Sequence, residues 1–215
     1  MKSVAVMLDG GYVQKRLYSM LGKRHPQASD VIAFAEGCVD ATRQELFRIY
    51  YYDCPPCSDM VTHPMSGART DLGRSAVARR LTRLQESLAV ADYVAFRRGE
   101  IKFRGWRLTR NAYTELTAGS RSCASGDFEY DLKQKGVDMR IGLDIAWLAS
   151  KRIVDEITLA AGDTDFVPAM KFARREGVRV ILVPMQNRSL SSVLRHHADE
   201  VRESTFLASR SAAHP

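Results

Sequence analysis

The sequence predicts an α/β fold of three layers, in which helices cover both faces of a central, mainly parallel sheet. Its short apolar runs, such as Val4 to Leu8, are continuous rather than alternating, which is typical of strands buried on both faces. In the last third of the chain, helical segments separate these runs, and this order favours parallel strands joined by right-handed crossovers. The 215 residues suffice for one substantial core.

The first quarter of the chain supplies two strands and two helices. Val4 to Leu8 is the first strand, and Asp9-Gly10-Gly11 marks a sharp exit from it. A helix follows from about Tyr12 to Leu21, and the apolar spacing of Asp30 to Thr42 predicts another. Glu45 to Tyr52 is rich in β-branched and aromatic residues and is predicted to be a strand.

The middle of the chain is less regular. Asp53 to Gly73 holds most of a Pro, Cys, Ser and Gly cluster and is predicted to be a loop. Arg74 to Leu88 is an amphipathic helix, with Val77 among its apolar residues and many arginines opposite. Tyr93 to Leu108 is predicted to form one or two short strands. Thr109 to Asp131 is polar and is expected to be an exposed loop or insertion.

The last third has the clearest pattern of alternating helices and strands. The predicted helices are Val137 to Lys151, Phe166 to Glu176 and Ser189 to His197, and the predicted strands are Glu156 to Ala161 and Val178 to Val183. Taken together, the elements predict a single domain over residues 1–208. A less typical, basic and loop-rich segment lies at about 53–131, and residues 209–215 are expected to be a flexible tail.

Composition restricts the functional classes. The formal charge of +7 raises the odds of a polyanionic partner, although many proteins carry such a charge for solubility alone. No apolar stretch is long enough to span a bilayer, and the start of the chain does not resemble a signal peptide. We therefore expect a cytoplasmic protein without a membrane partner, and its four cysteines are expected to be reduced thiols.

Aspartates follow two of the predicted strands. Asp9 directly follows the first strand, while Asp163 and Asp165 follow the strand Glu156 to Ala161. Ligands bind at the carboxyl ends of parallel strands, so these side chains meet at one rim if the two strands are neighbours. The alternative for each aspartate is a turn or helix-capping residue, and Asp165 in particular is placed to cap the next helix.

The helix before the second of these strands adds Asp138 and Asp144. Both flank its buried face, but they lie about 9 Å apart along the axis, so one ion is not expected to contact both. Asp138 is also placed to cap that helix. Carboxylates gathered at one rim repel each other, and a divalent cation relieves this. An all-oxygen ligand set favours Mg²⁺ or Mn²⁺, which activate water for phosphodiester cleavage.

Three motifs in order resemble those of NYN domains, particularly the LabA-like branch of this PIN-like nuclease family. The opening Val6-Met7-Leu8-Asp9-Gly10-Gly11-Tyr12 is the first. Lys135 to Asp144, with the sequence KGVDMRIGLD, is the second, and Ala161 to Pro168, with the sequence AGDTDFVP, is the third. Arg174 to Val180 resembles the usual continuation. The resemblance covers about residues 3–205.

The resemblance implies a Rossmann-like PIN fold and a metal-dependent ribonuclease, expected to be endonucleolytic. It carries over Asp9, Asp138, Asp144 and Asp163 as metal-binding and catalytic residues, with Asp165 as a further catalytic candidate. One departure is Gly11-Tyr12, where many relatives have an asparagine. The alternative is a catalytically weak or inactive RNA-binding protein on the same fold. A phosphatase or nucleotide-binding protein is disfavoured, because no glycine-rich phosphate loop is present.

A basic segment interleaved with aromatic residues is the preferred RNA contact, with single-stranded RNA as the expected partner. Its candidate residues are Arg97, Arg98, Lys102, Arg104, Trp106 and Arg107. The alternative is a solvated hairpin whose aromatic rings pack inward. Cys54 and Cys57 have the spacing of zinc motifs, with His63 and Cys123 as further ligands, although unpaired thiols are the preferred interpretation. The sequence leaves the oligomeric state open, a homo-oligomer included.

Overall fold

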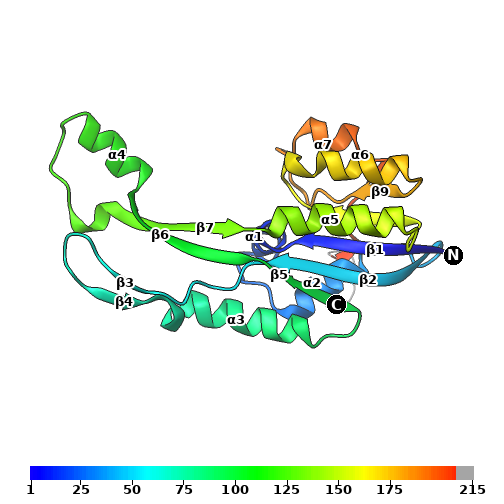
Figure 1. The fold of residues 1–215 in the computed structure, drawn as a ribbon, viewed down its shortest axis with the longest axis horizontal. Helices are drawn as coiled ribbons and strands as arrows, with labels where there is room; N and C mark the ends of the chain where they lie inside the picture. The colour runs from blue at the N-terminus through cyan, green and yellow to red at the C-terminus, as the bar shows by residue number, and fades with distance from the viewer. Residues whose placement is uncertain (207–215) are drawn as a thin grey trace. The chain divides into compact units, whose positions relative to one another are not determined.

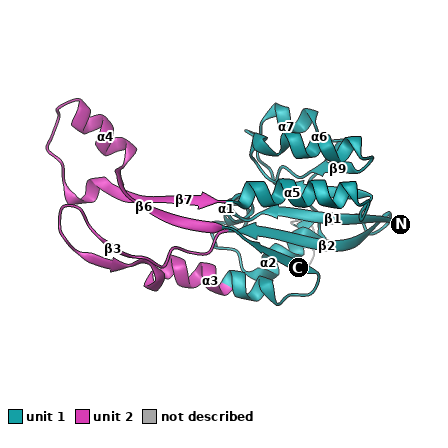
Figure 2. Cartoon of the chain, viewed as in Figure 1, with its two compact units in different colours: residues 1–53, 84–99, 136–215 teal, residues 54–83, 100–135 magenta. Residues whose placement is uncertain are grey.

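The computed structural model describes residues 1–206, which form two compact units (Figure 2). Unit 1 contains residues 1–53, 84–99 and the chain from 136 onward, and unit 2 contains residues 54–83 and 100–135. The chain therefore leaves unit 1 twice, after residues 53 and 99, and returns each time. The expected tail at 209–215 lies outside the described residues.

Unit 1 is built on a six-stranded sheet in the order β10-β9-β8-β1-β2-β5, and every pairing in it is parallel. The strands are β1 (Lys2–Asp9), β2 (Gln44–Asp53), β5 (Val94–Arg98), β8 (Glu156–Ala160), β9 (Arg179–Leu182) and β10 (Glu200–Val201). All residues of β1 from Val4 to Leu8 are buried, which is the reason for its continuous apolar sequence. The prediction of a mainly parallel sheet is confirmed.

Helices cover both faces of this sheet (Figure 1). Val6 and Leu8 of β1 pack in one core with apolar residues of α1 (Gly10–Met20), α2 (Ala28–Glu36) and the second half of α3 (Ala76–Ala89). On the opposite face, α5 (Val137–Ser150) packs on β1 and β2 and against α6 (Val167–Arg175). The short helices η3 (Thr164–Phe166) and α7 (Ser192–His196) complete the unit. The result is the expected three-layer architecture.

Unit 2 contains two antiparallel strand pairs. They are β3 (Met60–Thr62) with β4 (Arg69–Asp71), and β6 (Glu100–Leu108) with β7 (Phe128–Lys135). The unit also contains η1 (Leu72–Arg74), the first half of α3, α4 (Arg110–Thr117) and η2 (Ser125–Asp127). Cys57, Val61 and Leu72 form its small core, against which partly buried residues of β6 pack.

Unit 2 is more ordered than the sequence predicted. The predicted loop Asp53 to Gly73 contains the β3–β4 pair, and the predicted exposed loop Thr109 to Asp131 contains α4 and the start of β7. The loop predictions were wrong because these elements are short or mostly exposed, so they carry little apolar periodicity, whereas the alternative of an insertion at Thr109 to Asp131 agrees with its place in unit 2. Val77 is likewise 52% exposed, so it does not belong to the buried side of α3.

The helix expected over Asp30 to Thr42 ends earlier, at Glu36. The backbone at Gly37 comes so close to the end of the described chain that an added Cβ would lie 2.6 Å from Ser204 Oγ. A side chain at this position would therefore push the two segments apart. Gly37 thus marks both the helix end and a contact that periodicity alone does not reveal.

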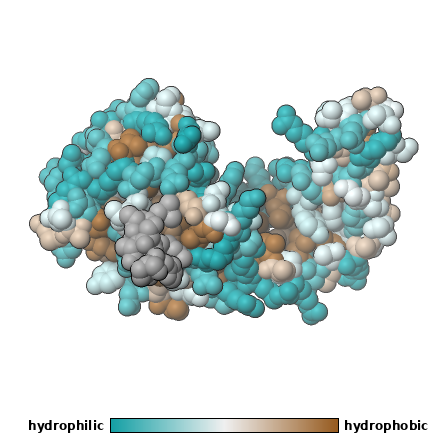
Figure 3. Space-filling model, turned by 180° about the vertical axis from the view of Figure 1, so that it is seen from behind, coloured by the Kyte–Doolittle hydropathy of each residue, from teal (hydrophilic) through white to brown (hydrophobic). Residues whose placement is uncertain are grey.

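The surface of unit 1 is mostly hydrophilic on one face, as expected when apolar side chains are buried in a core. Hydrophilic residues cover most of the face of unit 1 seen in Figure 3, and apolar residues appear there in small patches. Within the described residues, no helix combines the length and apolar composition needed to cross a bilayer.

Candidate active site

Acidic residues follow the carboxyl ends of three adjacent strands of the unit 1 sheet. Asp9 is the last residue of β1 and Asp53 the last of β2, while Asp163 follows β8. Leu8 lies opposite Tyr51 on one side and Ala160 on the other, so the three strands end at nearly the same level. The expectation that the strands carrying Asp9 and Asp163 are neighbours is confirmed, and their aspartates therefore share one rim.

Asp9 joins β1 to α1. Its Oδ1 accepts a hydrogen bond from the backbone N–H of Tyr12 at 3.3 Å, so Asp9 caps the amino-terminal end of α1. Burial raises the pKa of its carboxyl to about 6, and the charges of Asp138 and Asp53 act in the same direction. Asp9 is thus both the cap of α1 and an aspartate that burial holds towards its protonated form.

Asp53 is a rim residue that sequence reasoning missed. Its side chain is 5% exposed, and its Oδ2 accepts hydrogen bonds from Gln14 Nε2 at 2.8 Å and from Gln85 Nε2 at 3.1 Å. The sequence does carry a signal, since Asp53 ends an apolar strand in the same way as Asp9. We assigned it to the following loop because prolines and cysteines come directly after it.

The pair Asp9 and Asp53 gives a first prediction. Asp53→Asn should lower the pKa of Asp9 from about 6 towards its ordinary range, because it removes a neighbouring negative charge. Titration of the Asp9 carboxyl carbon by NMR measures this. Asp92→Asn, at an exposed turn, is the control and should leave the pKa of Asp9 unchanged. An unchanged pKa in Asp53→Asn would show that Asp53 carries no charge next to Asp9.

The remaining acidic residues come from α5 and η3. Asp138 lies in the first turn of α5, and burial raises the pKa of its carboxyl, with the charges of Asp163 and Asp165 adding to the effect. Asp163 caps η3, since its Oδ1 accepts from the backbone N–H of Asp165 at 3.0 Å. Asp163 and Asp165 are both exposed. Asp138 thus links electrostatically to Asp9 on one side and to Asp163 and Asp165 on the other.

Asp144 has different partners. Its Oδ2 accepts from the Tyr52 hydroxyl at 2.9 Å and from Arg97 Nε at 3.0 Å. Burial, and then the nearby Asp144 charge, raise the pKa of the Tyr52 hydroxyl, which keeps that donor protonated. The negative charge of Asp144 is therefore balanced by Arg97. Its predicted role as a metal ligand stays a prediction.

The donor set suits a hard divalent cation. The rim offers carboxylate oxygens, and Asp9 is held partly buried among like charges, an arrangement that a cation relieves. Among the described residues, no three His, Cys, Asp or Glu side chains already converge closely enough to hold an ion. Mg²⁺ commonly uses one or two carboxylates and keeps several waters, so Asp9 with Asp138 or Asp163 fits this mode.

Tyr12 occupies the region where the sequence departs from its relatives. Its hydroxyl donates to the backbone carbonyl of Pro184 at 2.6 Å, and an added Cβ on Gly162 would lie 2.7 Å from its ring. Arg16 on the same helix donates to the Met185 carbonyl at 2.7 Å. Tyr12 therefore fixes α1 to the segment after β9 and to the residue just before Asp163, and this requires a glycine at position 162.

The predicted RNA-contact residues are divided between the two units. In unit 1, Arg97 pairs with Asp144, and the Arg98 guanidinium lies 5.7 Å from the centre of the Phe96 ring. In unit 2, Trp106 Nε1 donates to the Thr62 carbonyl at 2.9 Å, and its ring packs against His63 and Tyr130. The remaining pairs are Arg107 with Glu129 and Arg104 with Asp131. Trp106 packs inward, as the hairpin alternative expects, and Lys102 is exposed.

Cys38 lies in the core of unit 1, and the other three cysteines belong to unit 2. Cys54 Sγ donates to the Glu100 carbonyl at 3.1 Å, while Cys57 packs in the small core of unit 2. His63, the suggested further ligand, instead faces the Ser125 carbonyl at 2.9 Å. The described cysteines form no disulfide, and whether Cys54 and Cys57 bind a metal stays a prediction.

Comparison with known proteins gives one family and two similar proteins. A family model described as the NYN domain matches residues 3–205. An uncharacterised protein of Sinorhizobium fredii is 36% identical over 91 residues, a match that spans 39% of this chain and 42% of that relative. A crystal structure of a protein of unknown function from Vibrio parahaemolyticus has a TM-score of 0.48 at 16% identity, covering 94% of this chain and 92% of the other.

Proposed function

This chain belongs to the NYN domain family, a PIN-like nuclease family, and on that premise we propose that it is a metal-dependent endoribonuclease of the LabA-like branch. The observation that carries the proposal is the position of Asp9. Its partly buried carboxylate lies between Asp53 and Asp163, at the carboxyl ends of three adjacent parallel strands, and burial raises its pKa to about 6.

We assign the cation to Asp9 together with Asp138 or Asp163, which lie on three different elements around the rim. A bound Mg²⁺ or Mn²⁺ supplies an activated water and neutralises charge on the phosphate. The chain's own residues hold and orient the groups around it. Asp9 is fixed by the amino-terminal end of α1, and Asp163 by its bond to the Asp165 N–H. Asp53 keeps the rim negative, which favours cation binding.

Asp144 is given a positioning role in this proposal. It holds Arg97 at the end of β5, and Arg97 also lies over the Tyr50 ring at 5.6 Å. An arginine held in this way next to the acidic rim suits contact with a phosphate of the substrate. Arg98 and the exposed cations of β6 extend the proposed contact to single-stranded RNA, because arginine and lysine pair with phosphates whatever the base sequence.

The test is cleavage of labelled single-stranded RNA by the purified protein. We expect cleavage with Mn²⁺, none with EDTA, and a loss of roughly 100-fold or more in Asp163→Asn, since metal-bound water supplies the nucleophile. Asp92→Asn is a matched control with the same charge change at an exposed turn, and it should cleave as the wild type does. Equal cleavage by wild type and Asp163→Asn would refute the assignment of the site.

A second candidate function is RNA binding without cleavage. The observation that favours it is the Arg97–Asp144 pair, which balances one carboxylate of the family motif without a cation. The aromatic Tyr12 near the asparagine position of relatives points the same way. This candidate predicts RNA binding that is equal in Mn²⁺ and EDTA, and intact RNA after prolonged incubation with the wild-type protein.

A further inference from the structure

Unit 1 carries a second group of charged side chains, most of them cationic, at a distance from the acidic rim. A cleft of about 400 Å³ lies between the end of α6 and the start of β9, and we name it the α6–β9 cleft. Four cationic side chains and one carboxylate line it, together with Gly177 and Val178. These charged residues are Lys171, Arg174, Arg175, Arg179 and Asp199.

The cleft lies at the amino-terminal edge of the sheet. Arg179 pairs in register with Glu156, the first residue of β8, whereas Asp163 follows the last residue of that strand. Five residues of strand separate the two levels, which corresponds to roughly 16 Å. The cleft is therefore distinct from the acidic rim, although both belong to unit 1.

The cations of the cleft are only partly neutralised. Arg174 Nε pairs with Asp199 Oδ1 at 2.8 Å, and the other oxygen of Asp199 accepts from the Val180 backbone N–H. Arg179 shares the buried Glu156 with Lys2. Within the described part of the chain, neither Lys171 nor Arg175 has a hydrogen-bond or ion-pair partner, and both are exposed.

The nearby His197 is affected by the same positive charge. Partial burial lowers the pKa of His197, and the charges of Lys171 and Arg174 lower it further. Stabilisation of the α6 carboxyl terminus accounts for Arg174 and Arg175, since cations in the last turn interact favourably with the helix dipole. It does not account for Lys171, one turn earlier, or for Arg179 on β9.

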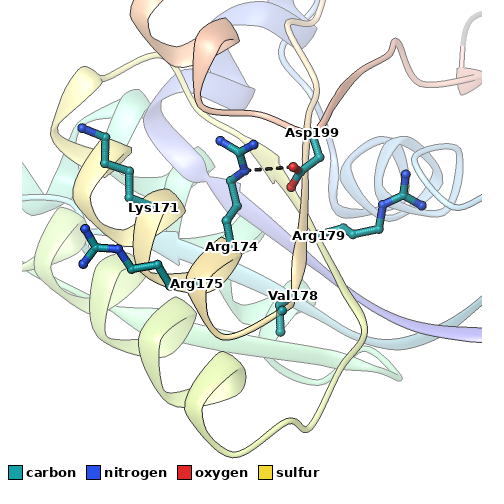
Figure 4. A pocket seen from close by; sticks show the side chains of 7 residues that line it. Lys171, Arg174, Arg175, Val178, Arg179 and Asp199 are labelled. Carbon is teal, nitrogen blue, oxygen red and sulfur yellow. Dashed lines mark hydrogen bonds and ion pairs between the residues drawn. The ribbon is translucent and has the colours of Figure 1, made fainter.

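The distribution of these charges favours an extended ligand. Figure 4 shows Arg175 and Arg179 extending in opposite directions, with Arg174 between them and directed at Asp199. Cations spread along a cleft suit successive phosphates better than one compact anion.

We propose that the α6–β9 cleft binds the phosphodiester backbone of single-stranded RNA, at a site separate from the acidic rim. Lys171 and Arg175 contact phosphates directly, and the ion pair with Asp199 holds Arg174 in position. The identity of the ligand rests on the proposed function, but binding at the cleft does not require cleavage. The cleft anchors a part of the RNA strand that is not being cut.

The test compares RNA affinity in EDTA, where no cleavage occurs. In Lys171→Gln/Arg175→Gln, we expect the Kd for a fluorescent single-stranded RNA to rise about 10- to 30-fold at about 0.1 M salt, since each lost phosphate contact contributes a factor of about five. The slope of log K against log salt should become shallower by about 1.4. The control Lys23→Asn/Arg48→Gln removes two exposed cations elsewhere in unit 1 and should change the Kd less than about twofold.

A footprint locates the contact independently of affinity. Bound RNA should protect Lys171 from acetylation while Lys23 remains reactive. Unchanged RNA affinity in the double variant, or equal acetylation of Lys171 with and without RNA, would overturn the proposal. The proposal would also be overturned if the double variant lost binding to phosphatidylglycerol vesicles but kept its RNA affinity, because this result would identify a membrane as the ligand. Failure of Mn²⁺-dependent cleavage with a positive footprint would instead refute the nuclease proposal and leave the cleft as an RNA site.

Discussion

Asp9→Asn should abolish Mn²⁺-dependent RNA cleavage, lowering its rate about 100-fold or more, and should stabilise the protein when no metal is present. The loss of activity follows from removing the central carboxylate of the rim. The gain in stability follows from the pKa of about 6, which shows that the folded protein disfavours the ionised carboxyl. Asparagine caps helices as well as aspartate does, so the start of α1 is kept.

The raised pKa of Asp9 also makes the stability of the protein depend on pH. The pKa of Asp9 is raised above its ordinary value of 3.8, so the folded state binds the proton more tightly than the unfolded state. Stability should therefore fall as pH rises from about 4 to about 6 and stay lower above it. At about pH 7.5 in EDTA, Asp9→Asn should be more stable than wild type by about 1 to 3 kcal/mol.

Thermal denaturation with and without Mn²⁺ separates the two effects. The cation binds the native state, so it should raise the Tm of the wild type and leave that of Asp9→Asn nearly unchanged. A lower Tm of Asp9→Asn in EDTA would mean that the carboxylate itself holds α1 in place. Cleavage by Asp9→Asn at the wild-type rate would remove Asp9 from the catalytic site.

Gly10→Ala should destabilise unit 1 by about 3 kcal/mol. A Cβ at Gly10 would lie 2.6 Å from the Tyr52 carbonyl oxygen and 2.9 Å from Asp53 Cβ. The carbonyl belongs to the backbone of β2, which pairs on both sides, so neither atom can move away easily. Relief of the clash would also separate Asp9 from Asp53.

The adjacent glycine provides a matched control. At Gly11, an added Cβ would lie 3.5 Å from Asp9 Oδ1, which is an ordinary contact. Gly11→Ala should therefore stabilise α1 by up to about 1 kcal/mol, because alanine favours the helix and restricts the unfolded chain. Urea denaturation of both variants measures the difference. Equal stabilities would show that Gly10 and Tyr52 are not in close contact.

The sheet could be predicted from the sequence because burial on both faces leaves a direct pattern. The apolar runs ending at Leu8, Ala161 and Val183 mark β1, β8 and β9 within a residue or two of their observed ends. Unit 2 could not be predicted in the same way, since β7 is a mostly exposed strand with the sequence FEYDLKQK. Exposed strands are held by pairing with distant residues, which local periodicity does not show.

The acidic rim was predictable only in part. Asp9, Asp163 and Asp138 follow from strand ends and motif spacing, and the structure links their charges. The partners of Asp144 depend on β2 and β5 being neighbours, which brings Tyr52 and Arg97 together across 45 residues of sequence. Asp53 was missed because the prolines and cysteines after it place it in the predicted loop, and its contacts with Gln14 and Gln85 come from distant parts of the chain.

The two departures of the chain into unit 2 have an evolutionary consequence. Each begins directly beyond a strand of the parallel sheet, after β2 and after β5, and each returns without interrupting a strand. Insertions at such loop positions leave strand pairing intact, so mutation can lengthen, shorten or replace them at little cost to folding. If unit 1 carries the proposed nuclease site, target preference can therefore diversify through unit 2 between descendants while the reaction chemistry is inherited unchanged.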